Sequence, residues 1–486
     1  MIVSSRAAVL RPTTLDPSVW PTALAALRSL GFDAVDIPLV WREHDRGGAA
    51  DLGAPRDLRR FFDLVAAEGL RAIVRLGPTC ADDAPAMGVP DRLLRDPGVC
   101  ARTRRGNPVV TLDGLRVMPV PSLGSTRWRD ESAGWVRAAS ALLAPLVAQG
   151  VVTAVVLGPA ALRTLRDAPD DRDHHPDLPA GGEDPAVTLR AYLDHLADAA
   201  RGVGVRDDAL VYAAGGHALT SPHTLELAAA RAVMLRAASP RWGVEGLWRL
   251  ARLATTLPHG ALLELRAGSA PFAAPVRATH ALQAARVVLA AGPRAITVAA
   301  GCVGHRWPGA LLDEKGRPRA HAAHWAKALA DAASWPEARP ETERAEVVTV
   351  DAARVRAWWS APALGELPRA ATLESLAHPA LAQGGDEVSR REQALQREAQ
   401  PFILAGDPAW CAPADAPWVT SVTPPGAALL RAVEGPEGRC LVAVSASEET
   451  AVVRVPEGWR DEHGAAVDAM DVAEGEVRVL RAGGER

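Results

Sequence analysis

The sequence predicts an α/β protein built around a (β/α)8 TIM barrel, followed by a reduced α/β linker segment and a small C-terminal β-sandwich. Up to about residue 335, short apolar runs rich in β-branched residues alternate with longer segments of helical period. Glycines come directly after several of the helical segments, at the points where the helices are expected to end. After about residue 427 the runs become short and alternating. Such an order favours a closed parallel barrel with a separate antiparallel unit behind it.

Eight runs are strand candidates in the first part of the chain, as many as a closed barrel of this type needs. They are Ala7 to Leu10, Ala34 to Leu39, Ala72 to Leu76, Val151 to Leu157, Ala209 to Ala213, Ala232 to Leu235, Ala261 to Leu265 and Ala295 to Ala299.

The helices between these runs have clear ends. The helical segments at 21–30, 56–68 and 279–291 are followed by Gly31, Gly69 and Gly292. Glycine adopts the left-handed conformation that closes many helices, so each position marks a C-terminus. The polar stretch from Asp167 to Pro185 has no apolar period and is predicted to be a long loop after the fourth strand.

The rest of the chain divides in two. Residues 336–410 hold a Pro- and Ala-rich stretch with one strand-like run and one charged helical run, which indicates a linker or a reduced α/β subdomain. Residues 411–486 hold alternating runs separated by Gly and Pro, which indicate a small antiparallel β domain. The predicted domains are therefore 1–335, 336–410 and 411–486.

Composition narrows the class of partner. The chain has 486 residues, of which 48% are hydrophobic and 23% charged, and its formal net charge is -4. These values are typical of a packed protein, and no basic stripe favours nucleic acid. We expect no membrane partner either, because no apolar run is long enough to span a bilayer. The N-terminus lacks the pattern of a secretory signal, so the expected location is the cytoplasm.

No cofactor or metal is predicted. The five cysteines are odd in number and none forms a CxxC pair, which argues against a disulfide framework and a structural zinc site. His174 and His175 lie beside Asp173 and Asp177, so a metal site is one interpretation of this loop. A solvated polar loop is the commoner explanation.

Four blocks, in order along the predicted barrel, resemble glycoside hydrolase family 35, the β-galactosidase family. The first places Trp41, His44 and Asp45 on a WNxHE-like motif. The second, VRLGPTCADDAPAMGVPDRLL, is similar to RPGPYICAEWxxGGxPxWLL and places Asp82 and Asp83 on the Glu and Trp of CAEW. The third, GALLELRAG, places Glu264 on the nucleophile, and the fourth, LLDEKGRP, resembles PLDExGRP.

The resemblance implies a retaining glycosidase site with two carboxyl groups, one nucleophile and one acid/base. The family's acid/base is the second glutamate of a VENEYG motif that ends strand four. Here Gly158, Pro159 and Ala160 stand in place of the Glu, Asn and Glu. None of these side chains can donate a proton, so the acid/base position, Ala160, is lost.

We therefore expect a divergent β-galactosidase-like barrel, a pseudo-enzyme that binds a glycan or serves as a protein-interaction scaffold. Trp41, His44, Asp45, Asp82 and Asp83 are the predicted substrate-binding residues, and Glu264 is the predicted catalytic residue. The alternative is an active retaining β-galactosidase with Glu264 as nucleophile and a relocated acid/base. Glu264 itself is either functional or a buried carboxylate satisfied by an arginine, for which Arg266 is one candidate.

Overall fold

The structure is a computed structural model of the whole chain. It describes residues 3–53, 57–80, 84–113, 116–158, 172–213, 227–228, 230–238, 243–266, 278–302, 309–335, 349–350, 404–405, 419–424, 427–435, 438–445 and 450–482.

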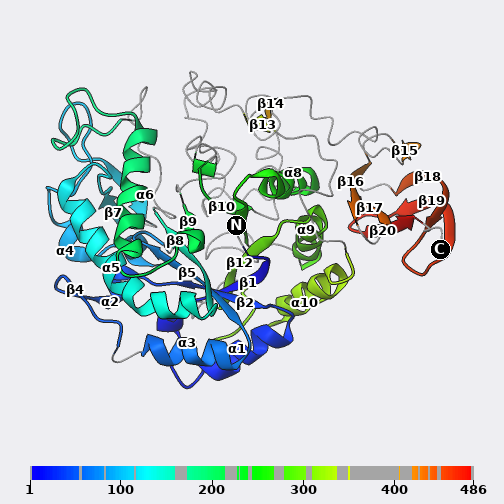
Figure 1. Ribbon diagram of the computed structural model, residues 1–486, viewed down its shortest axis with the longest axis horizontal. Coiled ribbons are helices and arrows are strands. Elements are labelled where there is room, and N and C mark those ends of the chain that lie inside the picture. Colours follow the sequence, from blue (N-terminus) through cyan, green and yellow to red (C-terminus); the bar gives the residue numbers. More distant parts are fainter. Residues whose placement is uncertain are drawn as a thin grey trace.

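Eight parallel strands close into a barrel, as predicted (Figure 1). They are β1 (Ser5–Leu10), β2 (Ala34–Pro38), β5 (Arg71–Gly77), β8 (Val152–Leu157), β9 (Leu210–Tyr212), β10 (Val233–Ala238), β11 (Ala261–Arg266) and β12 (Ala295–Cys302). Around the ring the order is β1, β12, β11, β10, β9, β8, β5, β2, and β2 pairs again with β1. Every strand lies within a few residues of its predicted position.

Successive side chains of each strand point alternately into the barrel and out of it. One set forms a small cluster inside the barrel that includes Ala7, Ile73, Val156 and Leu262. The other set points outward and joins the main hydrophobic core beneath the helices. The interior set defines which residues face the barrel axis, and this assignment positions the candidate site.

Helices cover the outside of the barrel. They are α1 (Trp20–Ser29), α3 (Leu58–Ala67), α5 (Thr126–Ala148), α6 (Pro185–Arg201), α8 (Gly243–Thr256), α9 (Ala278–Ala291) and α10 (Ala320–Ala332). Gly31, Gly69 and Gly292 have positive φ, which confirms the predicted helix ends. Gly316, in the DEKGRP block, packs closely against α1. A Cβ at this position would lie 2.9 Å from the backbone nitrogen of Ala23, so the contact requires glycine.

Several short elements between the barrel strands were not predicted. After β2 come α2 (Trp41–His44), β3 (Asp45–Arg46) and β4 (Ala49–Ala50). After β5 come η2 (Pro85–Gly88), α4 (Asp91–Leu94), β6 (Val110–Asp113) and β7 (Arg116–Pro119). Two further short elements are η1 (Pro12–Thr14) and η3 (Asp207–Ala209). After the barrel come β13 (Thr349–Val350), which lies in the strand-like run predicted within 336–410, and β14 (Leu404–Ala405). The unpredicted elements are too short to leave a clear period in the sequence.

The C-terminal unit is an antiparallel sheet, as predicted. Its strands are β15 (Ser421–Thr423), β16 (Ala428–Gly435), β17 (Gly438–Ser445), β18 (Ala451–Arg460), β19 (Ala466–Val472) and β20 (Val477–Ala482). One face joins the main core of the barrel, while the other buries a separate cluster around Trp459 and Leu441. The domain boundaries at 335 and 410 stay predictions, because the residues around 410 lie outside the described ranges.

Arg431 of β16 fastens this sheet to the barrel. Its side chain is buried and donates a hydrogen bond of 3.0 Å to the carbonyl oxygen of Ala290, at the end of α9. In Figure 1, α9 and α10 lie between the barrel strands and this sheet. The carbonyls at a helix C-terminus attract cations, so the guanidinium stabilises α9 as well as the contact between the two units.

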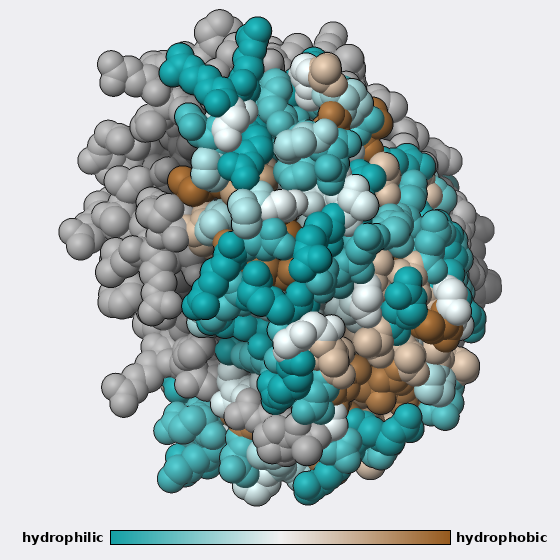
Figure 2. Space-filling view, turned by 90° about the vertical axis from the view of Figure 1, so that its left-hand side faces the viewer, coloured by the Kyte–Doolittle hydropathy of each residue, from teal (hydrophilic) through white to brown (hydrophobic). Residues whose placement is uncertain are grey.

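The face that carries α4, α5 and α6 is mostly hydrophilic, with smaller hydrophobic areas between the polar side chains (Figure 2). No helix in the described part of the chain combines the length and the apolar character that crossing a bilayer requires.

We predict that Arg431→Met lowers the free energy of unfolding by about 2 kcal/mol, because a buried hydrogen bond to a charged group is lost and the carbonyl of Ala290 keeps no such donor. Urea unfolding would measure the change. Arg460→Met is the control, since that exposed guanidinium bonds within its own hairpin. Equal stability of the two variants would contradict the fastening role of Arg431.

Candidate functional site

Four side chains from four strands meet inside the barrel. Arg75 of β5 donates from Nε to Oδ1 of Asp36 in β2 at 2.8 Å, and from Nη1 to Oε2 of Glu264 in β11 at 2.6 Å. A second bond from Nη2 reaches Oδ2 of Asp36. Thr297 of β12 donates its hydroxyl to the same Oδ2 at 2.7 Å. We call these four residues the central network.

The strand register places the central network. Leu262 and Ile73 belong to the interior cluster, so Glu264 and Arg75, two residues further along, face the same way. Glu264 lies opposite Thr297 in the pairing of β11 with β12. It is the third residue from the end of β11, in the half of the barrel where glycosidases of this fold hold their chemistry.

The network is closed to water and strongly charged. The side chains of Asp36, Glu264 and Arg75 are 0%, 3% and 4% exposed. Burial alone would lower the pKa of Arg75, but the charges of Asp36 and Glu264 outweigh it and hold that pKa above its ordinary value. Buried charges are tolerated when they are paired and hydrogen-bonded, and each of these three is.

Sequence reasoning missed three members of this network. Asp36, Arg75 and Thr297 were not singled out, and Arg75, on another strand, pairs with Glu264. The side chain of Arg266 lies outside the described residues, so its contact with Glu264 stays a prediction. A signal was present, because Asp36 and Arg75 each interrupt an otherwise apolar strand, AVDIP and AIVRLG. A charge in a strand buried on both faces requires a partner of opposite sign.

Trp41 and His44 lie in a packed aromatic cluster beside the barrel. Trp41 stacks on Trp135 with ring centroids 6.1 Å apart, and His44 stacks on the same indole at 6.0 Å. Both side chains are buried. Their role in substrate binding stays a prediction, and in this structure their rings are covered by other protein groups.

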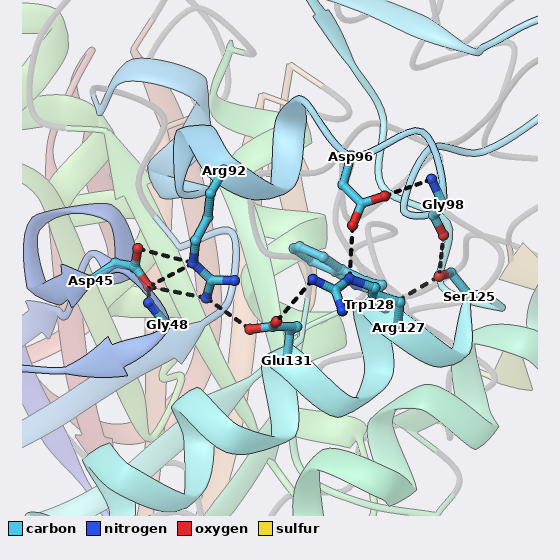
Figure 3. A network of polar contacts seen from close by, with 9 residues as sticks. All are labelled: Asp45, Gly48, Arg92, Asp96, Gly98, Ser125, Arg127, Trp128 and Glu131. Carbon is cyan, nitrogen blue, oxygen red and sulfur yellow. Dashed lines mark hydrogen bonds and ion pairs between the residues drawn. The ribbon is translucent and has the colours of Figure 1, made fainter.

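Asp45 belongs to a chain of alternating charges (Figure 3). Arg92 of α4 reaches Asp45 at 3.0 Å and Glu131 of α5 at 2.8 Å, while Arg127 pairs with Asp96 at 2.7 Å and lies 3.7 Å from Glu131. The hydrogen bond to Glu131 is the main cause of the raised pKa of Arg92. These pairs fasten the segment after β5 to α5, so Asp45 has a structural role whether or not it also contacts a ligand.

The end of strand four has an unusual backbone. Gly158 follows β8 with φ at +114°, and a Cβ there would lie 2.2 Å from the carbonyl oxygen of Ala213. No side chain fits at this position without movement of the backbone. Asp82, Asp83, Pro159 and Ala160 lie outside the described residues, so their predicted roles stay predictions.

The polar loop after strand four is bound to the protein at its described end. Asp173 accepts hydrogen bonds from the backbone of Arg102 and of His175. His175 accepts from the backbone of Asp177 at Nδ1, which leaves Nε2 to donate to the carbonyl of Gly98 at 3.0 Å. Both ring nitrogens are thus engaged. Within the described residues no group of three or more His, Cys, Asp or Glu side chains is placed to hold a metal ion.

We predict that Arg75→Met lowers the free energy of unfolding by about 3 to 5 kcal/mol, because it leaves two carboxylates buried without their cation. Arg71→Met is the matched control on the same strand. Its pair with Asp33, at 2.7 Å, is about one-third exposed and contributes about 0 to 1 kcal/mol. Chemical unfolding of both variants measures the contrast, and similar losses would contradict it.

His44 should make the protein sensitive to acid. Nδ1 donates to the carbonyl of Asp51, Nε2 is buried without a partner, and burial lowers the pKa of the ring. The folded state therefore keeps His44 neutral, whereas the unfolded chain takes up a proton below its ordinary pKa of 6.5. Stability falls as the pH drops through that value, by at most about 1.4 kcal/mol per pH unit. His44→Gln should reduce the difference in unfolding free energy between pH 7.5 and pH 5.5, the exposed His463→Gln should not, and equal pH dependence in both would refute the effect.

The sequence of the first quarter of the chain matches a known family. Residues 2–109 match the sequence model of Glycosyl hydrolases family 35. β-Galactosidase 3 of Oryza sativa subsp. japonica is 32% identical over 109 residues, which is 21% of this chain and 13% of that protein. β-Galactosidase-1-like protein 3 of Rattus norvegicus is 28% identical over 111 residues, 23% of this chain and 18% of that protein. The match thus spans less than a fifth of the length of these two relatives.

Solved structures share the whole fold. The β-galactosidase from Bacillus circulans sp. alkalophilus superposes with a TM-score of 0.63 at 9% identity, covering 99% of both chains. The β-galactosidase from the psychrophilic Marinomonas ef1 superposes at 0.58 and 11% identity, covering 98% of this chain and 99% of its own. At such identities the likeness is one of fold. Residues 2–109 therefore carry the sequence pattern of family 35, and the chain as a whole shares the barrel fold of these β-galactosidase structures.

Proposed function

We propose that this protein is a non-hydrolysing relative of the β-galactosidases that binds a glycan or serves as a protein-interaction scaffold. The observation that carries the proposal is the end of strand four. A retaining glycosidase needs a carboxylic acid there to protonate the leaving oxygen and later activate water. This chain has Ala160 at the acid/base position, and Gly158, two residues earlier, has no room for a side chain.

The state of Glu264 supports the same proposal. Its Oε2 accepts the 2.6 Å bond from Arg75, and its side chain is 3% exposed. A nucleophile must approach the anomeric carbon closely, and this carboxylate lies below the solvent-accessible surface. As part of the central network, Glu264 acts as a structural anion that balances Arg75.

The distribution of sequence similarity also fits. The family match ends at residue 109, before β8 and β11, the strands that would carry the two catalytic carboxyl groups. The part that retains the pattern holds the first three barrel strands and their packing. A protein that no longer catalyses hydrolysis would still need those residues in order to fold.

The second candidate function is an active retaining β-galactosidase with a relocated acid/base. One observation favours it: Asp36 shares the guanidinium of Arg75 with Glu264, so a second carboxyl group lies in the same network. Against it, Asp36 is fully buried and accepts hydrogen bonds from both Arg75 and Thr297. Both of its carboxylate oxygens already accept hydrogen bonds within the central network.

We predict no steady turnover of nitrophenyl β-galactoside by the purified protein. Loss of general acid/base catalysis lowers rates by about 10² to 10⁴. The nitrophenolate group of this substrate leaves with little protonation, so the substrate is the most favourable test for a residual nucleophile. Release of nitrophenol would be followed by absorbance. Steady turnover that disappears in Glu264→Gln, but persists in the surface control Arg71→Met, would establish the second candidate instead.

Ligand binding separates the two forms of the proposed function. A glycan that binds the native state raises the melting temperature, with a stabilisation of about 2.7 kcal/mol at 100 times its Kd. A screen of galactose and galactosides by thermal shift should reveal such a ligand. If none shifts the transition, binding of galactose and of the galactosides in the screen is wrong, and the scaffold form gains support.

A further inference from the structure

The order of strands around the barrel defines two opposite sides. The seam between β1 and β12 lies directly across the eight-stranded ring from the seam between β8 and β9, with β11 and β10 on one side and β2 and β5 on the other. The two seams differ in burial and backbone geometry at the carboxyl ends of their strands, where a ligand of a barrel of this type enters.

On the β1–β12 side, two of the described interior residues lie within reach of solvent. Val9 follows Ala7 on the interior face of β1, and Ala299 follows Thr297 on the interior face of β12. Both are partly exposed, whereas Ala7 and Thr297, one layer deeper, are 0% exposed. Solvent therefore reaches down to this pair and stops at the central network.

The pair lies next to the network in the strand register. Val9 is the β1 neighbour of Asp36, and Ala299 is the β12 neighbour of Arg266, two residues beyond Glu264. A molecule that enters here meets the methyl groups of Val9 and Ala299 first. The hydroxyl of Thr297, bonded to Asp36, lies one layer below.

The β8–β9 side is sealed by backbone. The N–H of Gly158 donates to the carbonyl of Gly77 at 2.8 Å, and the N–H of Ala213 donates to the carbonyl of Leu157 at 2.8 Å. A Cβ on Gly158 would lie 2.2 Å from the Ala213 carbonyl oxygen, and a Cβ on Gly77 would lie 2.6 Å from the Thr79 nitrogen. All these positions are buried.

We propose that Val9 and Ala299 form the entrance to the central network, and that the junction of Gly77, Gly158 and Ala213 closes the opposite side of the barrel. The inference rests on the proposed function, because it defines where the small, polyhydroxylated ligand of that function enters. Val9 and Ala299 then determine which ligands fit, since any larger side chain at either position narrows the opening.

Cysteine labelling tests the entrance without any ligand. Val9→Cys and Ala299→Cys should react with a methanethiosulfonate reagent on the order of tenfold faster than Ala213→Cys and Met234→Cys, whose parent side chains are buried and need local opening. Peptide-resolved mass spectrometry separates these sites from the native cysteines. Variants that keep the parent circular dichroism spectrum are compared. Equal rates at all four sites, or faster labelling at Ala213→Cys, would overturn the proposal.

Two glycine substitutions test the seal. Gly158→Ala and Gly150→Ala both place a side chain at positive φ, but nothing lies within 4 Å of a Cβ at Gly150. The first should lower the melting temperature much more than the second, and equal shifts would contradict the close backbone junction.

Labelling in the presence of galactose tests the entrance and the proposed ligand separately. Slower labelling of Ala299→Cys in galactose supports both. Fast labelling that galactose leaves unchanged supports the entrance and counts against a galactose-type ligand.

Discussion

The rest of the structure depends on one interaction, the buried guanidinium of Arg75 between Asp36 and Glu264. Two carboxylates in a barrel interior would repel each other and lose hydration, at a cost of several kcal/mol for each ion. Arg75 offsets that cost only because strands β2, β5 and β11 hold the three groups at hydrogen-bond distance. The network therefore couples the closure of the barrel to the presence of all three charges. Glu264 is part of this balance, because removing it alone would leave Arg75 with less compensation.

Two strand ends of the barrel differ in structure. In β11, Glu264 is a buried carboxylate paired with Arg75, while after β8 a backbone junction excludes side chains at Gly158. A glycine at positive φ against a neighbouring carbonyl cannot accept a side chain without rebuilding of the strand end. The β8–β9 side is thus closed by backbone geometry, while Val9 and Ala299 on the opposite side are partly exposed.

The barrel could be predicted from the sequence, because the spacing of apolar residues and the glycines at helix ends are local signals of secondary structure. The eight strands and the ends at Gly31, Gly69 and Gly292 followed from them. The central network could be predicted only in part. Glu264 was found through resemblance, but its partner Arg75 lies 189 positions earlier in the chain, and pairings of that range leave no local trace. The ion chain through Arg92, the short hairpins after β2 and β5, and the seal at Gly158 depend on three-dimensional packing in the same way.

The central claim is that Glu264 balances a buried cation and forms no bond to a sugar. Intact-mass spectrometry after incubation with nitrophenyl β-galactoside tests it most directly, because without a base to activate water any galactosyl-enzyme would accumulate. The account predicts an unchanged protein mass and no modified peptide around Glu264. A mass increase of one galactosyl group, located on Glu264 and absent from Glu264→Gln, would contradict it.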